Sequence, residues 1–115
     1  MLTLLDREAI NQIRLVERSI GRTDFFATLV GRLESSVTDF GQAFAECLAR
    51  GDTRGAQRAA HSLKGMCLQL GASALGQVFA DIESCAKGGD YAAARRMYDT
   101  NVALIAQSFE ALKSA

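Results

Sequence analysis

Apolar residues recur along the chain at the three- to four-residue spacing that is typical of amphipathic helices. The chain contains no proline and is rich in alanine and leucine, which favours helix over strand. The pattern therefore predicts an all-α protein. The predicted helices run from about Leu4 to Ile20, from Thr23 or Asp24 to Arg50, from Asp52 to Leu70, from Ser73 to Gly88 and from Asp90 to Leu112. The expected N-caps of the last four are Thr23 or Asp24, Asp52, Ser73 and Asp90.

Short connections link the predicted helices, so neighbouring helices are expected to run antiparallel. Thr3 and Asp6 are placed like a capping box before the first helix, and Gly71 is suited to end the third helix. The expected fold is an antiparallel up-down-up-down four-helix bundle, with an additional short N-terminal helix packed across one end. The N-terminal helix carries an apolar stripe formed by Ala9, Ile13, Val16 and Ile20, which we expect to pack in the core.

The size and charge of the chain narrow the functional classes. With 115 residues and 49% hydrophobic content, residues 1–115 are expected to form one domain. The 13 basic residues equal the 13 acidic ones, which argues against binding to nucleic acid. The longest uncharged stretch, residues 65–80, is shorter than a membrane span, and no export leader opens the chain. We therefore expect a cytoplasmic protein that does not bind membranes.

The residues that commonly bind metals are few and scattered. Cys47, Cys67 and Cys85 lie about twenty residues apart, unlike zinc or redox pairs, so we expect them in the core. His61 is the only histidine and Arg58 precedes it at i−3, which excludes the paired Glu-x-x-His motifs of a di-metal bundle enzyme. No acidic cluster suits Mg²⁺, and no glycine-rich loop suits a nucleotide. We expect no metal or cofactor in this chain.

The third predicted helix places His61 on the side opposite its apolar residues. A helix turns by about 100° per residue, which groups the side chains into two faces. His61 therefore points outward from the bundle. The inward face is formed by Ala56, Ala59, Leu63, Met66 and Leu70, and the outward face by His61 with Arg54, Gln57, Arg58, Lys64, Gly65 and Leu68.

A lone surface histidine is ordinarily a solvated side chain, but three neighbours of His61 change that interpretation. Lys64, at i+3, places an ammonium one turn away, where it can attract a phosphoryl group. Gly65, at i+4, costs about 0.5–1 kcal/mol relative to alanine inside a helix, and its benefit is space for a partner to approach the imidazole. Leu68 is an apolar residue on the wet face, consistent with a docking surface.

The run Ala-His-Ser-Leu-Lys-Gly at residues 60–65, followed by Leu-Gly-Ala at 70–72, resembles the signature of histidine-containing phosphotransfer (HPt) domains. The similarity continues through Leu75 to the pair Ile82-Glu83. The resemblance implies that Nε2 of His61 accepts a phosphoryl group from a receiver-domain phosphoaspartate, and that the group then passes to another receiver domain. It also implies that Glu83 hydrogen-bonds the other ring nitrogen, because HPt domains carry Glu or Gln at the matching position.

The same resemblance implies the partners, which are the receiver domains of a hybrid sensor kinase and of a response regulator. Mg²⁺ is then expected on the receiver, and this chain is a phosphoryl carrier, expected to be monomeric, without catalytic activity of its own. Met66-Cys67-Leu68 departs from the small residues that often follow Lys-Gly in the family, which makes the docking surface at Leu68 more apolar. Arg58 and Gln69 are further candidates near the phosphoryl site, but a solvated side chain explains each more simply.

Two alternatives stay open at this point. The first is a helical adaptor that binds receiver or kinase domains without being phosphorylated; the intact His61, Lys64 and Gly65 argue against it. The second is the phosphorylatable N-terminal domain of a chemotaxis-type kinase. The positions of Met1 and of the last predicted helix favour a free-standing carrier, although an excised domain would look the same. The upstream kinase, the downstream regulator, the signal and the output are not encoded in recognisable form.

Overall fold

A computed structural model describes residues 3–115, which form six α-helices and no strand, so the predicted all-α class is confirmed. Met1 and Leu2, the first residues of the predicted domain, lie outside this range. None of the helices in the described range combines the length and the hydropathy that a bilayer crossing requires. The helices are α1 (Arg7–Ser19), α2 (Phe25–Ala49), α3 (Thr53–Gln69), α4 (Ser73–Lys87), α5 (Tyr91–Thr100) and α6 (Val102–Lys113).

The ends of the central helices follow the predicted capping chemistry. The side chains of Asp52 and Asp90 accept hydrogen bonds from backbone amides in the first turns of α3 and α5. Gly71 has a φ of +80°, so it follows α3 in the left-handed conformation that glycine adopts without steric cost. α4 begins at Ser73 with Ala72 as its N-cap, one residue earlier than the predicted cap.

The predicted capping box at the start of the first helix is wrong. Oδ1 of Asp6 accepts hydrogen bonds from the backbone amides of Glu8 and Ala9, at 3.1 and 3.3 Å. Asp6 is therefore the N-cap residue itself, and α1 begins at Arg7 instead of Leu4.

The last predicted helix is divided in two, because Asn101 interrupts it between α5 and α6. The side-chain amide of Asn101 donates to the carbonyl oxygen of Met97 at 2.7 Å, and the Thr100 hydroxyl donates to that of Arg96 at 2.8 Å. Local bonds of this kind compete with the helical ladder. The apolar periodicity continues on both sides of the break, which is why the pattern alone predicted one helix.

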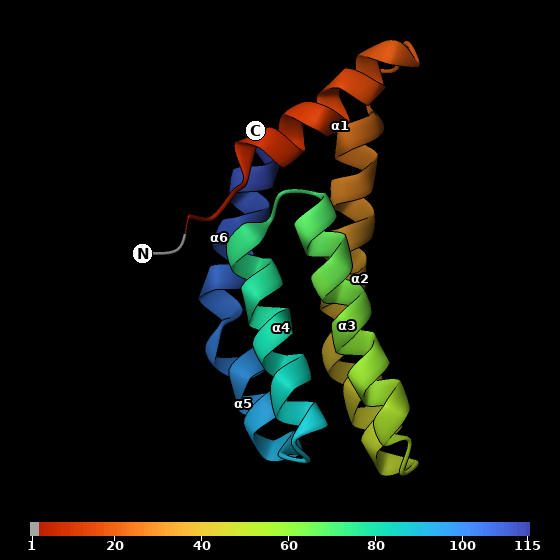
Figure 1. Cartoon of the computed structure of the whole chain (residues 1–115), viewed down its shortest axis with the longest axis vertical. Helices are drawn as coiled ribbons and strands as arrows, with labels where there is room; N and C mark the ends of the chain where they lie inside the picture. The colour runs from red at the N-terminus through yellow and green to blue at the C-terminus, as the bar shows by residue number, and fades with distance from the viewer. Residues whose placement is uncertain (1–2) are drawn as a thin grey trace.

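The long helices lie side by side, and α1 crosses the end of the bundle at which α2 begins and α3 ends (Figure 1). α3 packs against α2 on one side and against α4 on the other. In the core, the ring of Phe40 contacts those of Phe44, Phe79 and Tyr98, with centroids 5.1–5.3 Å apart. Burial of these large rings stabilises the bundle and holds α2, α4 and α5 together.

α3 turns a slightly different face to the core than the sequence predicted. Ala60 and Cys67 are fully buried, whereas the predicted core residues Ala59 and Met66 are only half-buried. Cys67 lies beside Gly76 of α4, so the buried stripe of α3 is displaced toward the side that meets α4. His61 remains on the exposed side of α3.

The three cysteines are free thiols. Cys67 is buried, which confirms its predicted place in the core, and burial raises the pKa of its thiol to about 12. Cys47 and Cys85 are half-buried and pack against the core.

α1 presents little of its predicted apolar stripe to the core. Within Arg7–Ser19, only Ile10 and Glu17 are buried. Val16 is 49% exposed and Ile20 is 51% exposed, so the prediction that they are core residues is wrong. A helix that crosses the end of a bundle contacts it over a short length only, and the remainder of its apolar face stays accessible.

Candidate functional site

His61 lies on the outer side of α3, where α4 runs alongside. Its side chain is 65% exposed. Glu83 reaches it from α4, and its residue is only 5% exposed. Oε2 of Glu83 lies 2.7 Å from Nδ1 of His61, within the range of a charge-assisted hydrogen bond. The structure therefore brings together a nearly buried carboxylate and a largely exposed imidazole.

Two lysines complete a cluster around the Glu83 carboxylate. Nζ of Lys64 donates to Oε1 at 3.1 Å, and Nζ of Lys87 lies 3.5 Å from Oε2. The sequence had suggested that the Lys64 ammonium faces the phosphoryl position, but here it is engaged with Glu83. Lys87 was not predicted as a site residue, although its position at i+4 from Glu83 is the signal that could have indicated it.

Glu83 is ionised at neutral pH although it is buried. Burial by itself raises the pKa of a carboxyl group, but the hydrogen bonds and positive charges of Lys64 and His61 hold the pKa of Glu83 below its usual value. An ionised carboxylate can only accept hydrogen bonds, so Nδ1 of His61 is the protonated ring nitrogen in this contact. In the neutral ring, Nε2 then keeps its lone pair.

Acidification is expected to remove the stability that this cluster contributes. The pKa of Glu83 is lower in the folded chain than in an unfolded one, where it is about 4.3; its contribution is complete above that value and is lost as the pH falls. Above about pH 5, the wild type is expected to have a larger unfolding free energy than Glu83→Gln. We expect this advantage to shrink as the pH falls from about 5 to 3. Urea unfolding at each pH measures this difference, and a constant value contradicts the coupling.

Two glycines leave room around His61 and Leu68. A Cβ atom built on Gly65 meets nothing within 4 Å, so packing inside the chain does not require a glycine there. A Cβ atom on Gly76 of α4 would lie 2.8 Å from Cδ2 of Leu68, so Gly76 makes room for that leucine. Gly76 was not predicted as part of the site, because a buried helical glycine leaves no periodic signal.

Leu68 belongs to an open groove of about 710 Å³ between α1, α2 and the last turns of α3. Leu68 is 53% exposed and lies seven residues after His61, about 10 Å further along the same side of the helix. Gln69 also lines the groove, whereas Arg58 is exposed one turn before His61 and takes no part in the cluster around Glu83. The lining is mainly apolar: Ala9, Ile13, Val16, Phe25, Leu29, Met66, Leu68 and Leu70, with Gln12, Arg32 and Gln69.

Within residues 3–115, no three His, Cys, Asp or Glu side chains are arranged to hold a metal ion.

Comparison with known proteins identifies the family of this chain. The family model described as Hpt domain matches residues 24–115, a segment that contains His61 and Glu83 and begins after α1. Comparisons with curated proteins and with solved structures find no match. Because the family model covers most of the 115 residues, the chain belongs to the Hpt domain family.

Proposed function

We propose that this chain is a histidine phosphotransfer protein of a two-component phosphorelay. His61 accepts a phosphoryl group from the phosphoaspartate of one receiver domain and passes it to another. The observation that carries the proposal is the 2.7 Å contact between Nδ1 of His61 and Glu83, which leaves Nε2 free on an exposed ring. Membership of the Hpt domain family supports a role in phosphorelays.

The transfer begins when the lone pair of Nε2 attacks the phosphorus of the phosphoaspartate. A P–N bond forms while the bond from phosphorus to the aspartate oxygen breaks, and the aspartate remains on the receiver as a carboxylate. The proton stays on Nδ1, where Glu83 balances the positive charge that the ring acquires. Transfer to the second receiver reverses these steps. Such chemistry depends mainly on positioning and charge neutralisation, and we expect Mg²⁺ and most catalytic groups on the receiver.

Lys64 and Lys87 provide the positive charge that a phosphorylated His61 needs nearby. Both ammonium groups contact Glu83 before transfer, and their side chains are 30% and 63% exposed. Flexible lysine side chains can turn toward a phosphoryl group while Glu83 keeps its bond to Nδ1. The sequence suggested that Lys64 attracts the phosphoryl group, and we propose the same role for Lys87.

The receiver is proposed to dock on the surface that joins His61 to the groove. A standard interface covers about 800 Å² per partner, which is wide enough to include both the imidazole and Leu68. The proposed arrangement of the helices is an up-down-up-down bundle with α1 across one end.

The proposed partners are the receiver domains of a hybrid sensor kinase and of a response regulator. The carrier is proposed to work as a cytoplasmic monomer.

A Gly65→Ala variant is expected to be more stable and less active at once. Alanine fits the open space at this position and is favoured over glycine inside a helix by about 0.5–1 kcal/mol. The added methyl group narrows the approach to His61, so transfer from a receiver slows while labelling by phosphoramidate is unchanged. The matched control is Gly31→Ala, an open helical position in α2 outside the groove lining. Equal transfer rates in both variants would contradict the proposed approach path.

The proposed function is tested by mixing the purified chain with receiver domains that a small-molecule phosphodonor has charged. We expect the chain to acquire a label that is labile in acid and stable in base, as a P–N bond is. If a receiver binds the chain but several charged receivers transfer nothing, the alternative function applies, which is a helical adaptor that binds receiver or kinase domains.

A further inference from the structure

α1 supplies one wall of the groove, yet few contacts fix its position. At its start, the backbone amide of Asp6 donates to the carbonyl oxygen of Gly71 at 2.7 Å. Along Arg7–Ser19, Ile10 is the one buried apolar side chain, and Glu17 is the other buried residue. α1 also precedes residues 24–115, which the family model matches. The angle at which α1 crosses the bundle therefore depends on a small number of contacts.

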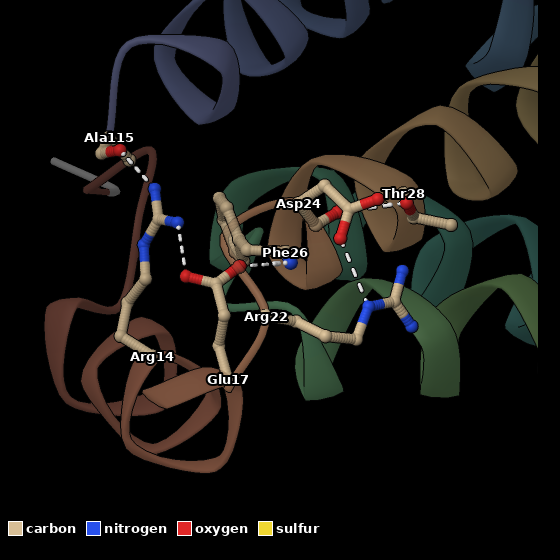
Figure 2. Close-up of polar contacts among 7 residues, drawn as sticks. All are labelled: Arg14, Glu17, Arg22, Asp24, Phe26, Thr28 and Ala115. Atoms are coloured by element: carbon tan, nitrogen blue, oxygen red, sulfur yellow. Dashed lines mark hydrogen bonds and ion pairs between the residues drawn. The ribbon is translucent and has the colours of Figure 1, made fainter. Parts of the chain in front are cut away.

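Glu17 joins the end of α1 to the start of α2 (Figure 2). Its Oε2 accepts a hydrogen bond from the backbone N–H of Phe26 at 2.8 Å, and its Oε1 accepts one from Nη1 of Arg14 at 3.0 Å. The Arg14 guanidinium lies 4.6 Å from the centre of the Phe26 ring, and its Nη2 donates to the carbonyl oxygen of Ala115 at 2.8 Å. One carboxylate and one guanidinium thus connect α1 with the first turn of α2 and with the residues that follow α6.

This contact replaces the cap that α2 would ordinarily form for itself. Asp24 is the N-cap residue of α2, but its side chain makes no capping hydrogen bond and is paired with Nε of Arg22 at 3.0 Å. The backbone N–H of Phe26, in the first turn of α2, donates instead to Glu17, which lies seven residues before Asp24. A local aspartate cap would stabilise α2 alone, whereas a cap supplied from α1 also fixes the direction of α1.

The direction of α1 decides the shape of the groove. Val16, next to Glu17 in the sequence, is 49% exposed and lines the groove, as does Ile13 one turn earlier. Leu68, at 53% exposed, faces the same groove from α3. A rotation of α1 about its buried residue Ile10 would separate these side chains without disturbing His61 or Glu83.

We propose that Glu17, together with Arg14, is a positioning residue for receiver docking: by capping α2 from α1 it sets the wall of the docking groove. The inference rests on the proposed function, because it takes the groove as part of the surface on which the receiver docks. It assigns to this pair a control over partner affinity that does not involve contact with the phosphoryl group. Glu17 and Arg14 therefore affect the KM for the receiver and not the reactivity of His61.

The test compares Glu17→Ala and Arg14→Leu with wild type in transfer from a charged receiver. Glu17→Ala removes both the acceptor for the Phe26 amide and the ion pair with Arg14. We expect KM for the receiver to rise about tenfold, the factor that corresponds to 1.4 kcal/mol of binding free energy, while kcat and labelling by phosphoramidate stay unchanged. The matched control is Glu34→Ala, which removes the ion pair with Lys113 at a place outside the groove lining.

Thermal unfolding of each variant separates positioning from general stability. If Glu17→Ala lowers the melting temperature but leaves KM unchanged, Glu17 only stabilises the fold and the proposal is overturned. An equal rise of KM in Glu34→Ala also overturns it. If wild type is labelled by phosphoramidate but takes nothing from charged receivers, the proposed function fails and this inference fails with it.

Discussion

A His61→Gln variant is expected to accept no phosphoryl group from any receiver or from phosphoramidate. His61 is the only histidine of the chain, and glutamine has no nucleophilic nitrogen with a free lone pair. The fold should be retained, because the imidazole is 65% exposed and glutamine is a good helix former. We expect the unfolding free energy to fall by no more than about 1.5–3 kcal/mol, the contribution of a hydrogen bond to a charged group, because Lys64 still pairs with Glu83.

Labelling with a radioactive phosphodonor measures this prediction directly. Ser62→Ala, at the exposed position next to His61, is the matched control and should be labelled like the wild type. The His61→Gln variant should still bind the receiver, since the docking groove is unchanged. Acid-labile label on the variant would place the acceptor on another residue and contradict the proposed role of His61.

Glu83→Ala is expected to slow transfer from a receiver by roughly 10- to 100-fold, the loss that follows removal of a carboxylate that orients a functional histidine. The variant removes the acceptor for Nδ1, so the ring is no longer held in the tautomer that exposes the Nε2 lone pair. It also leaves Lys64 and Lys87 without their shared carboxylate.

A second substitution separates the hydrogen bond from the charge. The amide oxygen of Glu83→Gln can still accept the Nδ1 proton, so this variant should transfer faster than Glu83→Ala. The matched control is Asp81→Ala, which removes an acid of α4 that pairs with Gln77 instead of His61. Single-turnover transfer kinetics give the rates, and wild-type transfer by Glu83→Ala would show that the imidazole needs no orienting carboxylate.

Periodicity was sufficient to predict most of the helices, because each of them carries a continuous apolar stripe. It failed at Asn101, where side-chain hydrogen bonds to the backbone end a helix whose apolar pattern continues. It also failed for α1, where Val16 and Ile20 are apolar yet half exposed. Periodicity identifies an apolar face, but it does not show whether the fold covers that face.

The residues of the candidate site were also predicted only in part from the sequence. His61, Lys64 and Gly65 lie within five residues of one helix, so the sequence alone placed them on one face. Glu83 came from the resemblance to HPt domains, since no local pattern joins residues on two helices. Glu17 is charged and lies in a short helix, so its burial could not be expected from the sequence. Its burial depends on the crossing of α1 over α2, which only the three-dimensional structure reveals.

The most direct measurement of the central claim is an NMR spectrum of the imidazole after the chain has been phosphorylated by a charged receiver. Uniform ¹⁵N labelling and long-range ¹H–¹⁵N correlation distinguish the two ring nitrogens of His61. We predict a phosphorus coupling at Nε2 and a proton at Nδ1, because Glu83 accepts that proton at 2.7 Å. A phosphoryl group on Nδ1, or a ring that stays unmodified while the receiver loses its phosphoryl group to this chain, would contradict the account.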